Sequence, residues 1–446
     1  MSSASPDTVL QQHSKLLNFL QTLLPDNIDD KDKFSATDFT RKRIFTIDFL
    51  TFCIIYLISD QNRFGYKHIL QTLWKKLRDI GFALSTALGP SGAAFCKARK
   101  KLPAKMIKDM FHRVIDLLAQ FKPNYRWKGH RLFAIDGMRI QLPASEELRE
   151  HFDSPSNKNG TVHYPQALIS KLCCVLTDVV YNFTVAPYLS SEREIALSHL
   201  NYLKPSDILI ADRGYPSYEL FWELMKRGIE FIMRVHISST WTVVKRFLES
   251  GKKEQIVTIK ITKNAKRHYK NDPTVPQYMT IRLVRITLST GETEVLMTSL
   301  LDTKKYAPKD FKMLYHWRWP IEETCKSVKH HQFIENFHSK DVNGIYQEIN
   351  AHYLLMAITR LFMLQAEAKT PDRVYGLSYK SAVQFVSDQL PVLLLIKDEV
   401  RLIFAIHETL NMITKMYEKP RAERSYPRQL RASGRNSYKT AASRDP

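Results

Sequence analysis

One stretch in the last third of the chain places charged side chains at helical spacing. It reads Tyr315-His-Trp-Arg318-Trp-Pro-Ile-Glu322-Glu-Thr-Cys-Lys-Ser-Val-Lys329. Because successive residues of a helix turn by about 100°, Arg318, Glu322 and Lys329 would lie on one face, as a carboxylate between two cations. Carboxylate oxygens are the ligands of hard metal ions, and Arg and Lys are natural partners of phosphate. By itself, the spacing of one such pair of charges favours a surface helix with ion pairs. Two further stretches favour metal-assisted chemistry on a phosphate ester instead.

Pro320 indicates where this helix begins. Proline has no N–H to donate and suits the first turn of a helix, whereas the residue before a proline is biased away from helical geometry. We therefore predict a helix that starts near residue 320 and carries Glu322 and Lys329 on a shared face. Tyr315 and Arg318 are expected to reach the site from a preceding turn or helix.

Two more carboxylates stand at the ends of short apolar runs. Leu132-Phe-Ala-Ile-Asp136 is followed by glycine, and Asp207-Ile-Leu-Ile-Ala-Asp212 is followed by Arg-Gly. Runs of this length and flanking sequence predict buried strands. Ligands of open α/β sheets gather at the carboxyl ends of strands, so Asp136 and Asp212 are candidates for one site. A single aspartate at a strand end is more often a turn former, which is the alternative for each.

The order of the expected elements predicts how these acids meet. It is three strands, a helix, a strand, a helix, a strand and a helix. This order fits an RNase H-like α/β core, in which antiparallel strands come first and parallel strands are added. Three carboxylates that converge from three elements are what two Mg²⁺ ions need to hold both oxygens of an in-line phosphoryl displacement. The expected strands are 132–136, after which the run 138–142 alternates, then 167–176, 179–185, 207–212 and 229–235. The expected helices are 191–203, opened by a capping box at Ser191-Glu-Arg-Glu194, and 218–227.

Composition favours a polyanionic partner. The 446 residues are 44% hydrophobic and 25% charged, which is typical of a globular protein of two or three domains. The formal net charge of +21 and the isoelectric point near 9.6 are not ordinary. Such a balance favours nucleic acid, because a basic protein neutralises phosphates and releases their counterions.

Several features bear on location and cofactors. The five cysteines form no Cys-x-x-Cys pair, which argues for reduced thiols and against a structural zinc site. The first residues, Met-Ser-Ser-Ala-Ser-Pro-Asp, lack the regions of a signal peptide. The most apolar run, 44–58, is too short to span a bilayer and is expected to be a buried helix. We therefore expect a cytoplasmic, nucleoid-associated protein with no membrane partner, and the absence of a Gly-rich phosphate loop predicts no use of ATP.

The stretch that ends at Lys329 resembles a known family. Tyr315, Arg318, Glu322 and Lys329 match all four positions of a Tyr-x2-Arg-x3-Glu-x6-Lys signature. This signature is characteristic of the insertion-sequence-four transposases, which are DDE enzymes. The resemblance implies that Tyr315, Arg318 and Lys329 contact DNA phosphate and hold a strand end next to the metal ions.

Two further regions extend the resemblance. Ile135-Asp-Gly with the downstream Leu142-Pro resembles the first acidic region of the family, and Ala211-Asp-Arg-Gly-Tyr with Phe231-Ile-Met-Arg234 resembles the second. The resemblance implies that Asp136, Asp212 and Glu322 are the catalytic residues and bind two Mg²⁺ ions. Mn²⁺ can substitute for Mg²⁺. Arg234 is expected to contact DNA.

Residues 213 to 321 separate Asp212 from Glu322. Relatives carry a β-rich insertion between these two acidic residues. Alternating patterns predict strands at 241–244, 254–261, 278–288 and 293–299. From Lys245 to Lys270 there are nine Lys or Arg against two Glu. This favours a surface that faces DNA, with a solvated hairpin as the alternative. A tryptophan of the insertion can hold a flipped base in relatives, and Trp241 is the one tryptophan of this insertion, so we expect it to contact DNA.

Residues 1–125 are predicted to be helical, and two segments outside the core are strongly basic. From Lys97 to Lys108 there are six Lys or Arg and no acid, and residues 419–446 hold eight Lys or Arg against two acids. The tail is expected to be disordered or ordered by DNA. A solvated helix face is the alternative for the first group. We expect DNA contacts from Lys97, Arg99, Lys100 and Lys101.

These observations divide the chain into six regions. We expect a helical DNA-binding region at 1–125, the first part of the RNase H-like core at 126–238, a β-rich insertion at 239–303, the second part of the core at 304–370, a C-terminal helical region at 371–418 and the basic tail at 419–446.

The leading hypothesis is a transposase that binds terminal inverted repeats, cuts the element free and joins its 3′ ends to target DNA. The family resemblance implies a hairpin intermediate and a homodimer in the synaptic complex. A catalytically idle DNA-binding regulator derived from such an enzyme and a general RNase H-like nuclease are the alternatives.

Overall fold

A computed structural model describes most of the chain. The described residues are 6–41, 43–59, 64–120, 125–154, 164–236, 241–270, 272–287, 291–318, 321, 329, 331–370 and 376–418. Three features predicted above lie outside these residues: the helix start near residue 320, the Glu322 side chain and the basic tail 419–446.

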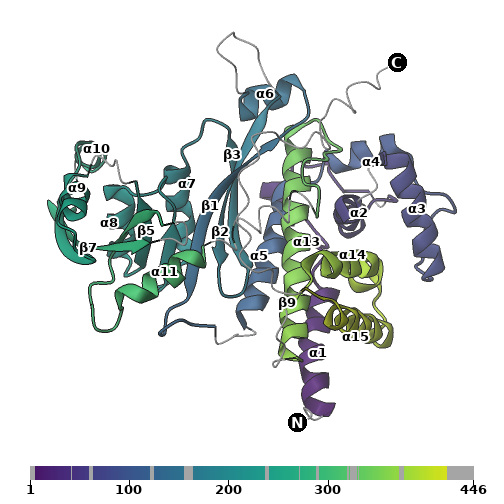
Figure 1. Ribbon diagram of the computed structural model, residues 1–446. Helices are drawn as coiled ribbons and strands as arrows, with labels where there is room; N and C mark the ends of the chain where they lie inside the picture. The colour runs from purple at the N-terminus through teal and green to yellow at the C-terminus, as the bar shows by residue number, and fades with distance from the viewer. Residues whose placement is uncertain are drawn as a thin grey trace.

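An eight-stranded mixed sheet runs through the middle of the molecule in the order β3-β2-β1-β4-β5-β8-β7-β6 (Figure 1). β1 is antiparallel to β2 and parallel to β4, β2 is antiparallel to β3, and β4 is parallel to β5. The first five strands confirm the predicted RNase H-like arrangement. The strands are β1 (Leu132–Gln141), β2 (Gln166–Cys174), β3 (Val179–Pro187), β4 (Ile208–Ala211), β5 (Glu230–Val235), β6 (Glu254–Lys260), β7 (Tyr278–Thr287) and β8 (Thr293–Thr298).

Alternation along β1 divides its side chains between two hydrophobic cores. Leu132 and Ala134 belong to one core, and Phe133 and Ile135 belong to the other. Because successive residues of a strand point to opposite faces, Asp136 shares the face of Ala134. This face is covered by α13 (Val342–Ala368) and is called the α13 face below. The opposite face is covered by α7 (Glu192–His199) and α8 (Tyr218–Lys226) and is called the α8 face.

The helices from both ends of the chain pack together on the α13 face. α13 is buried along most of its length, lies beside α5 on this face of the sheet, and stands between the sheet and α2, α3, α4, α14 and α15 (Figure 1). It packs on α5, α2, α14 and α15, so the regions 1–125 and 371–418 share one hydrophobic core with the sheet. The buried helix predicted at 44–58 is confirmed as α2. These helices are α1 (Pro6–Gln21), α2 (Ile47–Ser59), α3 (Tyr66–Asp79), α4 (Gly92–Arg99), α5 (Ala104–Gln120), α14 (Tyr379–Leu395) and α15 (Glu399–Lys415).

The expected insertion extends the sheet. β8 pairs with the core strand β5, and β7 and β6 follow outward from it. The strand predicted at 241–244 is wrong, because this segment begins α9 (Thr242–Glu249), and a further short helix, α10 (Lys263–His268), follows β6. In α9 the buried side chains are Val244 and Phe247, which are three residues apart and therefore lie on one helical face. Burial of this face outweighs the strand preference of the β-branched residues at its start.

Smaller differences concern the elements around the core. The runs at 132–136 and 138–142 form the single long strand β1, which is followed by α6 (Glu146–Phe152). The predicted helix at 191–203 is α7 followed by a 3-10 turn, Leu200–Tyr202. Ser191 is its N-cap residue but makes no side-chain cap hydrogen bond, so the predicted capping box is not formed. Within the described parts of the chain, no helix combines the length and apolar character that crossing a bilayer requires.

Candidate active site

Asp136 and Asp212 come together where the parallel pairing of β1 and β4 ends, although β1 continues past Asp136 to Gln141 and the strand end predicted at Asp136 is therefore wrong. β1 and β4 are parallel, and Ala134 pairs with Ile210 at the end of their ladder. Each aspartate stands two residues beyond this pair, so both lie at the same edge and on the α13 face. Asp212 is held by a tight turn in which its Oδ1 accepts a hydrogen bond from the Gly214 N–H at 2.8 Å. The geometry brings the first two predicted acids to one place.

A glutamate from the α8 face adds negative charge beside these aspartates. A Cβ atom placed on Gly137 would lie 2.7 Å from Oε2 of Glu192, so the glycine makes room for this carboxylate. The Tyr215 hydroxyl donates to Glu192 Oε2 at 3.1 Å. The pKa of Tyr215 lies above its ordinary value because the ring is buried and because Glu192, Asp136 and Asp212 oppose its ionisation. Concentrated negative charge of this kind suits a divalent cation with oxygen ligands.

The third predicted acid, Glu322, lies outside the described residues. Among the residues that are described, no group of three His, Cys, Asp or Glu side chains could hold a metal ion. The residue before it, Ile321, is buried on the α13 face and its main-chain oxygen accepts a hydrogen bond from Lys171 Nζ at 2.9 Å. Lys171 lies directly opposite Asp136 in the β1–β2 ladder. Ile321, the neighbour of Glu322 in the sequence, therefore lies on the same side of the sheet as the two aspartates.

Tyr315, Arg318 and Arg234 form a second cluster. Tyr315 is in the last turn of α11 (Pro308–His316) and Arg318 follows it, so both precede residue 320, as predicted. The guanidinium carbons of Arg318 and Arg234 lie 5.7 Å and 5.9 Å from the centre of the Tyr315 ring, and Arg234 pairs with Glu294. Tyr315 and Arg318 are only 5% and 6% exposed. The phosphate contacts expected of these two side chains are therefore not available to them as they stand.

Lys329 lies against the strand that carries Asp136. Its Nζ donates to the main-chain oxygen of Arg139 at 2.6 Å and lies 3.5 Å from Glu335 Oε1. This pairing differs from the interpretation that Lys329 only forms ion pairs with the acids of its own helix. Lys329 thus contacts the strand to which Asp136 belongs, three residues further along β1.

Three arginines that the sequence analysis did not single out as site residues lie near Asp212. Arg139, Arg193 and Arg213 are exposed and line a hollow of about 480 Å³ that Asp212 and Glu192 also line. Arg213 follows Asp212 directly, and Arg193 lies in the first turn of α7, within the serine-glutamate motif. The available signal for these arginines in the sequence was that Arg193 and Arg213 each stand next to an acidic residue. Exposed guanidinium groups beside carboxylates suit a phosphate backbone.

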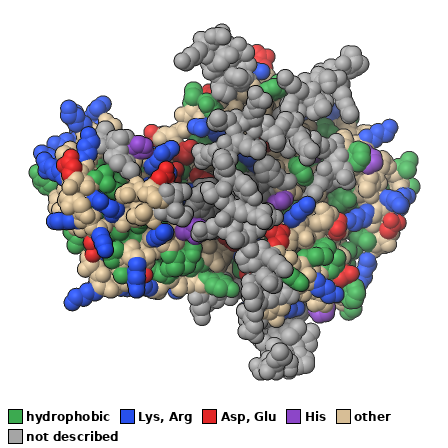
Figure 2. Space-filling model, viewed as in Figure 1, with side chains coloured by type: hydrophobic (Ala, Val, Ile, Leu, Met, Phe, Trp, Pro, Cys, Tyr) green, Lys and Arg blue, Asp and Glu red, His purple; other side chains and the backbone are tan. Residues whose placement is uncertain are grey.

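Trp241 lines a larger hollow of about 600 Å³ between α8, α9 and α10, together with Lys260 and Lys263. Its ring centre lies 6.1 Å from that of Phe221. Arg193 lines this hollow as well as the one beside Asp212, so the two hollows adjoin. Figure 2 shows Lys and Arg side chains gathered over α9 and α10. All nine Lys and Arg from 245 to 270 are exposed: Lys245, Arg246, Lys252, Lys253, Lys260, Lys263, Lys266, Arg267 and Lys270.

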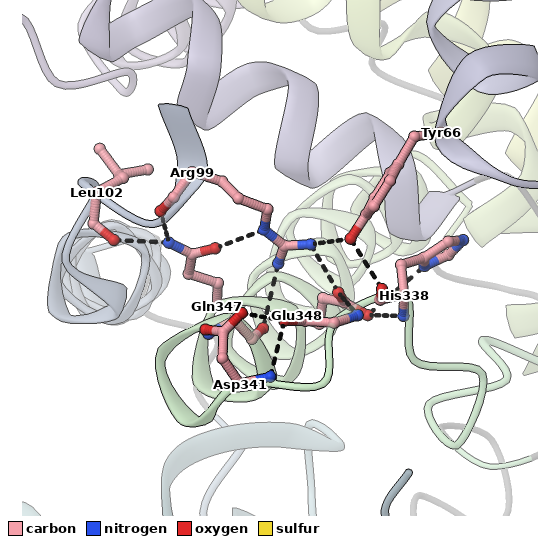
Figure 3. Close-up of polar contacts among 9 residues, drawn as sticks. Tyr66, Arg99, Leu102, His338, Asp341, Gln347 and Glu348 are labelled. Carbon is pink, nitrogen blue, oxygen red and sulfur yellow. Dashed lines mark hydrogen bonds and ion pairs between the residues drawn. The ribbon is translucent and has the colours of Figure 1, made fainter. Parts of the chain in front are cut away.

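The basic group at the end of α4 is divided between the surface and the interior. Lys97 and Lys100 are exposed, and Lys101 pairs with Asp38 at 2.9 Å. Arg99 is 2% exposed, and the expectation that it contacts DNA is wrong. Its guanidinium is enclosed by Tyr66, Gln347, Glu348 and the main chain of α13 (Figure 3). A DNA-binding test of this helix must therefore leave Arg99 in place.

Comparisons with known proteins agree with this geometry. The transposase InsG of insertion sequence element IS4, from Escherichia coli K12, is 23% identical over 300 residues, which cover 66% of this chain and 64% of InsG. The putative transposase InsZ of the same organism is 28% identical over 138 residues, which cover 30% of this chain and 46% of InsZ. The match thus spans less than two thirds of either relative.

A solved structure of the piggyBac transposase synaptic complex with hairpin DNA has a TM-score of 0.45 and 9% identity, and the match covers 90% of this chain and 82% of that chain. At this TM-score the likeness supports no conclusion about the present chain. The family model described as the transposase DDE domain matches residues 127–359, more than half of the 446 residues, and includes both aspartates and the stretch from Tyr315 to Lys329. The chain therefore belongs to the family of transposases with a DDE domain.

Proposed function

We propose that this chain is the DNA transposase of a bacterial insertion sequence. It binds the terminal inverted repeats, cuts the element free and joins its 3′ ends to target DNA by transesterification. The observation that carries this proposal is the pair Asp136 and Asp212, each two residues beyond the last pair of the parallel β1–β4 ladder, on the face where Ile321 is buried. Membership of the family further implies that cutting depends on a divalent metal ion.

The proposed chemistry divides roles among the residues of the site. Asp136, Asp212 and Glu322 hold two Mg²⁺ ions, or Mn²⁺ in their place, which supply activation of the attacking water or 3′-OH and stabilisation of the leaving oxygen. The exposed Arg139, Arg193 and Arg213 bind phosphates of the strand that enters the hollow beside Asp212.

We propose that the DNA runs from the acids across Arg193 toward Trp241 and the basic surface of α9 and α10. The adjoining hollows and the nine exposed cations support this path. Lys329 contacts the strand end beside β1. For Tyr315, Arg318 and Arg234 the same role requires that the residues covering them move when DNA binds, because Tyr315 and Arg318 are buried in the DNA-free chain.

The assembly and its location are proposed on the same basis. Two copies of the chain bring two element ends together in the synaptic complex, and the ends pass through a hairpin intermediate. The protein acts on DNA in the cytoplasm, in association with the nucleoid. Exposed Lys97 and Lys100 on α4 contribute a second DNA contact in this arrangement.

A cutting assay with the DNA that flanks the gene tests the function. We expect purified protein to nick the inverted repeats in Mg²⁺ or Mn²⁺ and to join their 3′ ends to a plasmid. Binding of the ends without cutting in either metal would support the idle regulator instead. Cutting with no preference for these ends over a scrambled sequence would support a general nuclease.

Neutralising the surface of α10 tests the proposed DNA path. Replacement of Lys263 and Lys266 by glutamine is expected to weaken end binding and to reduce the slope of log affinity against log salt by up to about 2, since each phosphate contact contributes about 0.9. Fluorescence anisotropy over a salt series measures both quantities. The matched control replaces Lys380 and Lys415, which are equally exposed on α14 and α15. Equal slopes for both variants would remove α10 from the interface.

A further inference from the structure

Arg234 stands beside Asp212 at the edge of the sheet where the proposed chemistry takes place. Met233 pairs with Ala211 at the end of the parallel β4–β5 ladder, and Arg234 and Asp212 each follow this pair by one residue. Met233 and Ala211 belong to the core on the α8 face, so the next residue of each strand is directed to the α13 face. Arg234 therefore begins on the strand next to Asp212, at the same level and on the same face.

Glu294 of β8 reaches this arginine from the other side. Arg234 is opposite Leu296 in the β5–β8 ladder, and Glu294 lies two residues from Leu296, so it is a diagonal neighbour of Arg234 on the same face. Its Oε1 accepts a hydrogen bond from Arg234 Nη1. Burial raises the pKa of Tyr315, Arg318 and Arg234 oppose this rise, and Glu294 adds to it. The carboxylate thus lies among the side chains that are expected to contact DNA.

The ion pair between Arg234 and Glu294 is incomplete. Within the described residues, Arg234 Nε and Glu294 Oε2 are buried and have no hydrogen-bond partner. A guanidinium and a carboxylate can form two parallel hydrogen bonds, and a buried polar atom that lacks a partner lowers stability. This pair therefore stabilises the fold less than a complete pair would. A phosphate beside Arg234 would offer further acceptor oxygens to the same guanidinium.

The pair is also the accessible part of the cluster. The side chains of Arg234 and Glu294 are 25% and 13% exposed, whereas Tyr315 and Arg318 are buried. A phosphate group that approaches from solvent can therefore reach Arg234 while the other two side chains are still covered. What stands in its way at Arg234 is the carboxylate of Glu294.

We propose that Glu294 occupies the place of a DNA phosphate on Arg234 in the DNA-free chain, and that a phosphate of the element end displaces it. This inference rests on the proposed function. Carboxylate and phosphate oxygens are both anionic acceptors for a guanidinium, so one can replace the other. The contact is autoinhibitory, because the Arg234–Glu294 pair must be broken before the phosphate binds. Glu294 thus lowers the affinity of the chain for DNA.

A second role for the same carboxylate makes the opposite prediction. If Glu294 orients Arg234 toward DNA, its removal loosens the guanidinium and weakens DNA binding. If Glu294 competes with DNA, its removal frees the guanidinium and tightens binding. Loss of a negative charge anywhere on the chain also favours DNA, so the control must lose one nearby. Glu292 is suitable because it is exposed and lies two residues before Glu294.

The test replaces Glu294 by glutamine in the full-length chain and measures binding of end DNA by fluorescence anisotropy in EDTA. We expect the dissociation constant to fall by about 10-fold, because a charge-assisted hydrogen bond that competes with the DNA is removed. The matched control Glu292→Gln has the same net charge and should lower the constant by less than about 3-fold at physiological salt. In an Arg234→Gln background, Glu294→Gln should have no larger effect than Glu292→Gln.

Three results would overturn the proposal. Equal constants for Glu294→Gln and Glu292→Gln would mean that the carboxylate does not compete with DNA. A constant above the parental value would assign Glu294 the orienting role. A tenfold gain that persists in the Arg234→Gln background would show that the effect does not pass through Arg234.

A second variant covers the case in which Glu294→Gln does not fold, as judged by circular dichroism. Glu294→Asp keeps the charge but withdraws the carboxylate from Arg234, so its constant should fall below that of the parental protein, and an equal or higher constant would overturn the proposal. Failure of the parental protein to bind end DNA would refute the proposed function itself, and is therefore distinguishable from a result confined to the variants.

Discussion

Replacement of Asp136 or Asp212 by asparagine is expected to reduce DNA cutting by about 10³-fold or more, because a metal-assisted step loses several kcal/mol of transition-state stabilisation. Asparagine keeps the shape of the side chain but not the anionic oxygen that a hard cation prefers. Glu322→Gln is expected to behave in the same way. Binding of end DNA should stay close to the parental level, since it depends on cations elsewhere. Cutting rates and anisotropy on the same end DNA measure the two quantities.

Asp207 supplies a matched control for this prediction, because it begins the strand that Asp212 follows. Its carboxylate accepts hydrogen bonds from Arg131 Nε at 2.8 Å and from Arg131 Nη2 at 2.5 Å. Asp207→Asn should therefore lower the free energy of unfolding by about 1–3 kcal/mol but leave cutting per folded molecule unchanged. Parental cutting by both Asp136→Asn and Asp212→Asn would refute their catalytic role. A parallel loss of cutting and DNA binding would instead indicate damage to the fold.

Replacement of Arg99 by methionine is expected to lower the free energy of unfolding by about 3–5 kcal/mol, because it leaves Glu348 as a buried charge without its partner. Arg99 Nη1 lies 2.9 Å from Glu348 Oε1 and 2.8 Å from the Tyr66 hydroxyl, and its Nε lies 3.0 Å from Gln347 Oε1 (Figure 3). These bonds join α4 to the first turns of α13. Denaturant unfolding followed by circular dichroism measures the loss.

Lys101 provides the comparison, since it is only two residues away from Arg99 in the sequence. Lys101 forms an ion pair with Asp38. Its side chain is 48% exposed, so Lys101→Met should change the free energy of unfolding by less than about 1 kcal/mol. Similar losses for the two variants would mean that the buried network contributes no more than a surface ion pair. Arg99→Met should also leave unfolding cooperative, because the apolar core around α13 is unchanged.

The same network predicts a dependence of stability on pH. Burial alone would raise the pKa of Glu348, but Arg99 and His338 outweigh it and hold the pKa at about 2. A carboxyl group with a folded-state pKa below its unfolded value stabilises the fold above the unfolded value, which is 4.5 for glutamate. This contribution is lost as pH falls from 4.5 toward 2. Unfolding experiments over this range should show a smaller loss in Glu348→Gln than in the parent, and equal losses would contradict the assignment.

Local patterns in the sequence were sufficient to predict the core strands and the position of Asp212 directly after β4, whereas Asp136, predicted at a strand end, lies inside the longer strand β1. A buried strand is a short apolar run between turn-forming residues, and both features are local. Reliance on local patterns also produced the wrong prediction of a strand at 241–244, where the helix α9 begins. The β-branched side chains of this segment favour a strand, but Val244 and Phe247 are buried together, and only a helix places both on one face.

The tertiary structure alone decided which cations are buried and which remain at the surface. Arg99 stands in a run of basic residues that looks uniform in the sequence, yet its ion-pair partner Glu348 is 249 residues away along the chain. Lys171 likewise bonds to a carbonyl 150 residues away. Nothing in the spacing around either residue reports such partners. The physical reason is that a charge can be buried only where the fold supplies a partner for it, and that partner is set by packing between distant segments.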